Sequence, residues 1–338
     1  MSQVSFGIFD HVDRGDEPVG VLYEHRLRLI EAADAAGFRT WHVAEHHATP
    51  LGMAPSPGIF LAAAATRTRQ IRLGPLVYIL PLYPPLRLIE EIAMLDQLSN
   101  GRFELGVGRG ISPYELAYAG INFLEAQGIY EEALAVVLAG LASDTLTHRG
   151  EHYRFNGVPM ELRPVQQPHP PLWQGVVNPD GAAAAARRSV NVVTNAGNAA
   201  VKPLVERYFE TWKGAPGQAP PLVGAQRHVY IADTDAAALA EARPAYRAWY
   251  DNLTHLWRRF NTVPMRFAES LDRALEIGTA IVGSPATVRA EIERHVAETG
   301  VNYFVTRLAF GTLGYERTRR SLDLFTHDVL PHFKETPR

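Results

Sequence analysis

The chain has 338 residues, of which 46% are hydrophobic and 20% charged, and its formal net charge is -3. This balance argues against a basic nucleic-acid-binding surface, and the absence of cysteine excludes disulfides, thiolate nucleophiles and cysteine metal sites. No segment approaches the roughly eighteen apolar residues of a membrane span, and Asp10, Asp13 and Asp16 come too early for a secretory signal, so we expect a cytoplasmic protein with no membrane partner.

The N-terminal half alternates between strand and helix patterns. Short apolar, β-branched segments predict strands at residues 4–9, 40–44, 71–80 and 102–107. Helical periodicity predicts helices at residues 19–36, 56–66, 86–98 and 125–141. Each predicted strand is therefore followed by a helix that can cover it.

The C-terminal half continues this alternation after a predicted hairpin at residues 145–155. Strands are predicted at 172–177, 190–194, 222–231 and 301–308, and helices at 181–188, 201–212, 235–252, 285–298 and 315–329. Strands joined by right-handed helical crossovers favour a closed parallel barrel, so we predict a single α/β domain, a (β/α)8 TIM barrel, over residues 1–338. Two long segments, about 143–171 and 253–284, are predicted as insertions in the βα loops that cover the active face.

Ionisable side chains follow the second predicted strand directly, as Glu45, His46 and His47. Barrel enzymes keep their chemistry at the C-terminal strand ends, and a histidine there can act as an acid, a base or a hydrogen-bond donor. His46 and Glu45 are therefore candidate catalytic residues. The alternative is that one histidine only caps a neighbouring carbonyl. No metal site is expected, because adjacent strand residues face opposite ways and no HExxH pattern is present.

A glycine-rich run, GVGRG at residues 106–110, ends the fourth predicted strand. Its flexible backbone beside the cation of Arg109 suits a phosphate or a flat ring, and a plain tight turn is the alternative. It is not a dinucleotide fingerprint, because Ile111 stands where the third glycine should be.

The fifth predicted strand runs into a helix start, GVVNPDG at residues 175–181. Asn178 is a predicted N-cap and Pro179 a first helical residue, which leaves backbone N–H groups at a positive helix end. This arrangement predicts an anion site. Asp180 opposes it, because a carboxylate in the first turn would repel a phosphate if it pointed inward.

These motifs occur together in the bacterial luciferase-like monooxygenases, a superfamily that the sequence resembles from residue 4 to about 194 and more loosely from 283 to the last helix. The resemblance is carried by AEHH at 44–47, LGPLVYILP at 73–81, LDQLSNGRF at 95–103 and GVGRG at 106–110. It implies FMN at the barrel mouth, reduced by a separate flavin reductase and reacting with O2 to oxidise a small-molecule substrate such as an aldehyde or ketone.

The resemblance also implies roles for individual residues. His46 matches the active-site histidine and Arg109 a residue that approaches the flavin phosphate. Leu76 and Val77 fall where luciferases distort the backbone beneath the flavin ring, so we expect a cis peptide bond between them. The residues expected to bind the cofactor are Leu76, Val77, Gly108, Arg109, Val177, Asn178, Asp180 and Gly181.

Two departures from the luciferase pattern stand out. Gly108 replaces a reactive cysteine, so light emission is not expected, and Gln127 replaces a second phosphate-binding arginine. Some members of the superfamily use a deazaflavin and transfer hydride without O2, and others bind flavin without catalysis, so both remain alternatives. We also expect a homodimer, paired through helices near the second to fourth strands, with the alanine-rich helix 56–66 as a flat face. The strand ends near Asp10, His11, His228 and Phe310 define no unique substrate pocket.

Overall fold

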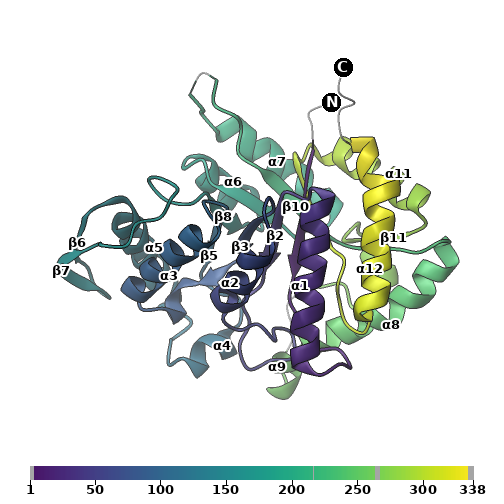
Figure 1. Ribbon diagram of the computed structural model, residues 1–338, viewed down its shortest axis with the longest axis horizontal. Helices are drawn as coiled ribbons and strands as arrows, with labels where there is room; N and C mark the ends of the chain where they lie inside the picture. Colours follow the sequence, from purple (N-terminus) through teal and green to yellow (C-terminus); the bar gives the residue numbers. More distant parts are fainter. Residues whose placement is uncertain (1–3, 216, 263–266, 334–338) are drawn as a thin grey trace.

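A parallel barrel wrapped by helices forms the protein in the computed structural model, which describes residues 4–215, 217–262 and 267–333 (Figure 1). The barrel strands are β1 Ser5–Asp10, β2 Thr40–Val43, β3 Arg72–Pro75, β4 Tyr78–Ile79, β5 Leu105–Gly108, β8 Leu172–Gly175, β9 Asn191–Thr194, β10 Val223–Ile231 and β12 Tyr303–Arg307. They run in the order β3-β2-β1-β12-β10-β9-β8-β5-β4. A parallel bridge between Leu73 and Phe103 joins β3 to the chain entering β5 and closes the ring. The predicted (β/α)8 fold is confirmed.

The third predicted strand is divided into β3 and β4 at Leu76 and Val77. The peptide bond between these residues is cis, which confirms the expectation from the sequence. β3 pairs with β2 on one side, whereas β4 pairs with β5 on the other, through Tyr78 with Val107 and Ile79 with Gly108. The two short strands thus share one position in the barrel wall.

The helices that cover the barrel follow the predicted pattern. They are α1 Val19–Ala36, α2 Pro57–Arg67, α3 Pro85–Leu98, α5 Ala126–Ala142, α6 Pro179–Ala186, α7 Asn198–Thr211, α8 Asp235–Leu253, α11 Pro285–Thr299 and α12 Gly314–Leu324, with 3-10 turns at Leu80–Leu82 and Leu330–Phe333 and a π-helical turn at Phe325–Val329. α1 ends where the left-handed Gly37 donates to the carbonyls of Ala33 and Asp34. Among the described residues, no helix is both long and apolar enough to cross a membrane.

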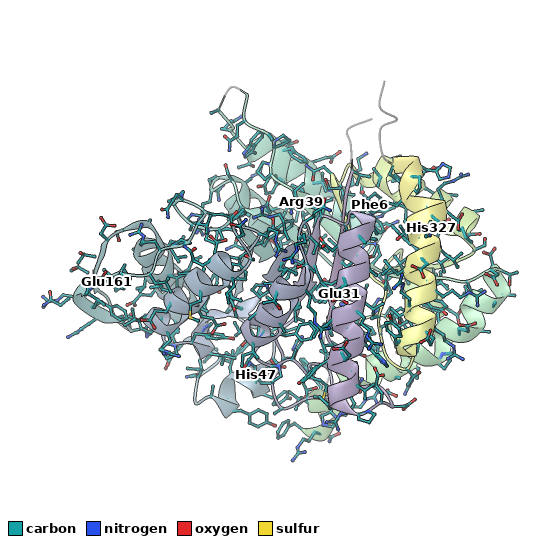
Figure 2. The ribbon with its side chains drawn as sticks, viewed as in Figure 1. Phe6, Glu31, Arg39, His47, Glu161 and His327 are labelled. Atoms are coloured by element: carbon teal, nitrogen blue, oxygen red, sulfur yellow. The ribbon has the colours of Figure 1, made fainter. Side chains whose placement is uncertain are left out.

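The barrel interior is filled by side chains. Strand residues alternate between the inside and the outside of the barrel, and a compact inner cluster contains Phe9, Ala44, Trp173, Val193, Tyr303 and Val305. The outward residues join a larger core beneath the helices. Because the interior is closed, ligands are restricted to the barrel ends. Figure 2 shows Phe6 and Arg39 toward one end and His47 toward the other, where α4 (Pro113–Tyr118) and α9 (His255–Arg259) lie in Figure 1.

The two predicted insertions lie at different ends of the barrel. Residues 143–171 contain the predicted hairpin, β6 Thr145–Arg149 and β7 Arg154–Pro159, but they join α5 to the start of β8. The backbone N–H of Gln166 donates to Asp96 at 2.8 Å, beside the turn that leads into β5. This segment therefore covers the N-terminal strand ends, and the prediction that it is a βα insertion over the active face was wrong. Helix α5 precedes it, so it is an αβ connection.

The second insertion, residues 253–284, also follows a helix, α8, but part of it does reach the C-terminal strand ends. Phe260, just after α9, stacks on Tyr114 of α4 with ring centroids 4.5 Å apart. The insertion contains α9, α10 Leu271–Glu276 and β11 Ala280–Gly283, none of which the sequence predicted. β11 pairs in parallel with the second half of β10, through His228 with Ala280. Residues 263–266 of this predicted insertion lie outside the described residues.

Candidate active site

His46 stands at the end of β2 and is held by a carboxylate that the sequence did not reveal. Its Nδ1 lies 3.1 Å from Oε1 of Glu115, and the two side chains are 13% and 4% exposed. Glu115 belongs to the first turn of α4, whose N-cap Ser112 accepts from the Glu115 backbone N–H. Since an ionised carboxylate can only accept, Nδ1 carries the proton in this pair. Nε2 of His46 is then the nitrogen that can accept a proton.

Glu45 points to a different set of partners. Its Oε1 lies 2.7 Å from Nε2 of His47, and its Oε2 accepts from the backbone N–H of Ile79 at 2.9 Å. Burial raises the pKa of Glu45, whereas its hydrogen bond raises the pKa of His47. The pair therefore ties the end of β2 to β4, and its hydrogen bonds do not include the imidazole of His46. Among the described residues, no group of three His, Asp or Glu side chains converges as a metal site.

A strip of small and apolar residues crosses the neighbouring ends of β4, β5 and β8. A Cβ atom added to Gly108 would lie 2.5 Å from Cγ2 of Val77, so the two residues are in tight contact. On β8, a Cβ added to Gly175 would meet no atom within 4 Å, and Val177 is 74% exposed. Together with Leu76, these residues form what we call the flat strip. The structure thus brings together four of the predicted cofactor residues.

Arg109 and the start of α6 follow adjacent strands beside the flat strip, because β5 pairs with β8. Arg109 donates from Nε to the carbonyl of Gly110 at 3.3 Å and its guanidinium lies 4.7 Å from the Phe123 ring centroid. In the described part of the chain it forms no ion pair, so its charge is available to an anionic ligand.

The N-terminus of α6 is partly occupied by its own cap. Asn178 accepts the backbone N–H of Gly181 at 2.8 Å, and Pro179 has no N–H group. The N–H of Asp180 is left at this helix end, beside an exposed carboxylate. Gln127, at the expected position of a second arginine, donates instead to Glu131 on its own helix at 2.6 Å. Arg109 is therefore the principal cation at this side of the barrel mouth.

Aromatic and polar side chains occupy the opposite side of the barrel mouth, at the ends of β1, β10 and β12. The rings of His11 and His46 are 5.4 Å apart, and Trp249 of α8 donates from Nε1 to Nδ1 of His11 at 3.1 Å. Arg307 lies 2.8 Å from Nε2 of His228 and packs against the Trp249 ring at 4.9 Å. Sequence reasoning missed Arg307 and Trp249, although Arg307 is a charged residue at an inward position of a predicted strand.

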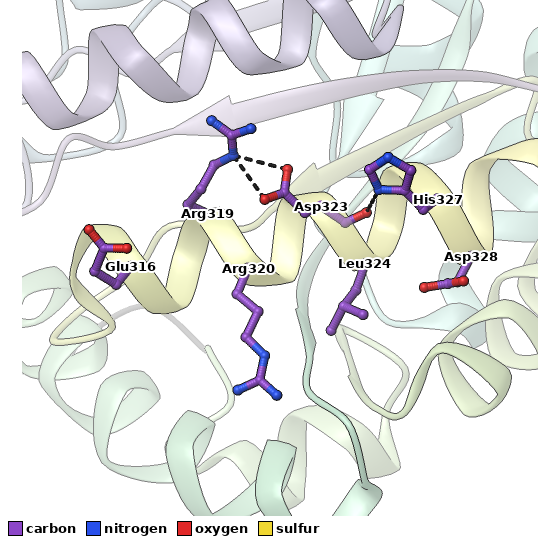
Figure 3. A pocket seen from close by; sticks show the side chains of 7 residues that line it. All are labelled: Glu316, Arg319, Arg320, Asp323, Leu324, His327 and Asp328. Atoms are coloured by element: carbon purple, nitrogen blue, oxygen red, sulfur yellow. Dashed lines mark hydrogen bonds and ion pairs between the residues drawn. The ribbon is translucent and has the colours of Figure 1, made fainter.

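A hollow of about 290 Å³ lies on the outer surface around α12 (Figure 3). Four of its charged or ionisable side chains, those of Arg319, Arg320, Asp323 and His327, pair with one another or with nearby residues. Arg319 bonds Asp323 at 2.9 Å, Arg320 bonds Asp233, and Nδ1 of His327 lies 2.7 Å from the Asp323 carbonyl. Because it contains no strand-end residue, we place the functional site at the barrel mouth.

Comparisons with known proteins identify the family and the fold of this chain. The model of the luciferase-like monooxygenase family matches residues 4–303. The uncharacterized protein y4wF of Sinorhizobium fredii is 40% identical over 92% of both chains. The oxygenase component of flavin-dependent trigonelline monooxygenase from Acinetobacter baylyi is 26% identical, over 98% of this chain and 96% of its own. Among solved structures, monooxygenase RslO1 from Streptomyces bottropensis is 27% identical, with a TM-score of 0.85 over 98% of this chain and 100% of that one.

Proposed function

The chain belongs to the luciferase-like monooxygenase family, and from this membership we propose that it is the oxygenase of a two-component flavin-dependent monooxygenase. Reduced FMN would come from a separate flavin reductase, and O2 and a small organic substrate, such as an aldehyde or a ketone, would be consumed. A relative that is itself named the oxygenase component of a flavin-dependent monooxygenase supports this division of labour.

The observation that carries the proposal is the flat strip beside His46. Gly108 at the end of β5, and Gly175 and Val177 at the end of β8, present little side-chain bulk. The exposed Val177 and the open direction above Gly175 suit the face of an isoalloxazine ring. When bound, the reduced flavin would supply the electrons that activate O2. Leu76 and Val77 would contact the ring from the wall shared by β3 and β4.

The phosphate end of FMN would meet Arg109. Its guanidinium is free of ion pairs among the described residues and can form charge-assisted hydrogen bonds to phosphate oxygens. Asn178 and Gly181 would border the phosphate at the start of α6, where the N–H of Asp180 is the remaining donor. The Asp180 carboxylate would turn away from the phosphate.

His46 would move the proton during oxygen transfer. Because Glu115 holds the proton on Nδ1, the ring can accept or return a proton only at Nε2. Glu115 acts through His46 and is a positioning residue. Glu45 would support the same region by fixing His47 and β4.

Cofactor identity and oxygen consumption test the proposal together. Protein purified from the host and then incubated with FMN should show a flavin absorption spectrum and the mass of FMN, and with a flavin reductase and NADH it should consume O2 in the presence of a substrate. A deazaflavin that co-purifies and transfers hydride without O2 would overturn the proposal. Flavin binding without any oxygen consumption would assign the chain to flavin binding alone.

A further inference from the structure

Arg307 brings a buried positive charge to the barrel mouth without a carboxylate in direct contact. The residue is 5% exposed, and Nη1 lies 2.8 Å from Nε2 of His228. With the Gln226 amide oxygen turned toward it, the guanidinium donates from Nε and Nη2 at 3.1 and 2.5 Å. The rings of Phe9 and Trp249 cover it at 5.0 and 4.9 Å. Within the described residues, no carboxylate oxygen lies within the 4.0 Å of an ion pair.

The nearest acidic residues are committed elsewhere. Asp10 is held by Arg26 at 3.1 Å, and Asp13 accepts from the backbone N–H of Gly311 at 2.8 Å. They act on Arg307 through space, which opposes the burial that lowers its pKa to about 9. Arg307 therefore stays protonated near neutral pH while its direct partners are neutral.

The neighbouring histidines cannot supply the missing negative charge. Burial and the charge of Arg307 hold the pKa of both His11 and His228 well below the usual range, so both rings are neutral. Nδ1 of His11 accepts from Trp249, which leaves the proton on Nε2 as a donor. The group formed by Arg307, His11, His228 and Gln226, which we call the Arg307 cluster, thus offers hydrogen-bond donors and a net positive charge.

The Arg307 cluster lies across the barrel mouth from the proposed flavin site. β1, β12 and β10 are consecutive in the barrel, and the flat strip lies across the barrel on β4, β5 and β8. His46, which follows β2, stands between them, with its ring 5.4 Å from that of His11. A molecule anchored at Arg307 would therefore extend past His46 toward the flat strip.

We propose that the Arg307 cluster binds a carboxylate of the organic substrate, so that the substrate class is a carboxylic acid oxidised at a carbon remote from that group. A carboxylate would accept from the guanidinium and from Nε2 of His11, and it would supply the negative charge in direct contact with Arg307 that the described residues do not provide. The inference rests on the proposed function, because it assigns a substrate to the same barrel mouth.

Calorimetric titration of the flavin-free protein with acids and their matched primary amides tests this inference. The probes are acetate, benzoate, phenylacetate and octanoate, each beside its amide. At least one acid should bind about tenfold or more tightly than its amide, since charge-assisted hydrogen bonds are roughly twice as strong as neutral ones. Arg307→Met should abolish this preference. An acid preference that survives in Arg307→Met, or the absence of any preference in the wild-type protein, would overturn the inference.

Arg227 provides the matched control. Arg227 is also a buried arginine, and burial lowers its pKa to about 9. Because it follows the inward Gln226 on β10, its side chain points out of the barrel. There Nη2 donates to Oδ1 of Asn198 at 3.1 Å. Arg227→Met should keep the acid preference. If Arg307→Met does not fold, Arg307→Lys, which keeps the charge but loses the planar fork, should weaken acid binding severalfold, and an unchanged affinity would count against the inference.

Saturating FMN separates substrate from cofactor. FMN should leave the affinity of the acid unchanged, whereas competition would assign the Arg307 cluster to the flavin phosphate and overturn the inference. Failure of the proposed function is distinguishable, because it would appear as a lack of flavin binding or of oxygen consumption in the same preparations. Acid binding without either activity would refute the monooxygenase and leave an acid-binding protein.

Discussion

Replacing Glu115 with glutamine probes how His46 is positioned. The substitution keeps the size of the side chain but removes the charge that accepts from Nδ1 of His46 at 3.1 Å. A hydrogen bond to a charged group contributes about 1.5–3 kcal/mol, and both side chains are largely buried, at 13% and 4% exposure. If the whole interaction acts in the transition state, Glu115→Gln should lower kcat roughly 10- to 150-fold.

The assay is product formation with FMN reduced by an added flavin reductase, with the FMN dissociation constant measured beside it. Glu115→Gln should leave FMN affinity unchanged, because Glu115 is not on the flat strip. In a His46→Ala background the same substitution should cause no further loss, since its effect passes through the imidazole. Equal losses in both backgrounds, or wild-type turnover in the single variant, would refute the positioning role.

A second histidine–glutamate pair supplies the control for this experiment. Oε1 of Glu132, on α5, lies 3.0 Å from Nε2 of His148. His148 belongs to β6 of the hairpin, which is far from the barrel mouth. Glu132→Gln removes a comparable contact and should leave turnover unchanged. A loss of activity in this control would show that the assay reports general destabilisation.

Three further predictions concern the cofactor and the assembly. Arg109→Ala should weaken FMN binding roughly 10- to 150-fold and riboflavin binding little, because a contact of about 1.5–3 kcal/mol to the phosphate is lost; equal losses in flavin titrations would rule out the phosphate role. Gly108→Ala should lower the free energy of unfolding of the flavin-free protein by about 1–3 kcal/mol in urea, because its Cβ would lie 2.5 Å from Cγ2 of Val77. Adding Val77→Ala should restore that stability. Unchanged stability in Gly108→Ala would show that Val77 moves aside without cost. Light scattering should give a homodimer that Ile59→Asp dissociates, because Ile59 on α2 and Met94 on α3 are 76% and 55% exposed; a monomer mass at micromolar concentration would contradict this.

The barrel was predictable because each strand is a short apolar segment followed by a separately recognisable helix. The family resemblance placed the distortion of the third strand at Leu76 and Val77. Gly74 and Pro75 indicate a departure from a plain strand, but they do not fix the position of the break. The insertion at 143–171 was assigned to the wrong end of the barrel. Its sequence predicts a hairpin, but it does not show at which end of the barrel the preceding helix α5 ends. β11 was missed because four residues carry too little periodicity.

The candidate site was predictable only in part, for reasons of distance along the chain. His46 follows a strand directly, so its position could be inferred, but Glu115 is 69 residues away in a six-residue helix with no apolar pattern. Arg307 and His228 are 79 residues apart on adjacent strands. Their inward positions follow from strand alternation, but their contact depends on the order of the strands in the closed barrel.

Oxygen transfer from isotopically labelled O2 is the most direct test of the account. The wild-type protein, supplied with FMN, a flavin reductase, NADH and a substrate drawn from the acids that bind, should form a product that contains one atom from O2. His46→Ala should bind FMN with wild-type affinity and form the labelled product at only a small residual rate. A labelled product at the wild-type rate from His46→Ala would remove His46 from the chemistry, and the absence of label in every product of the wild-type protein would contradict the monooxygenase assignment itself.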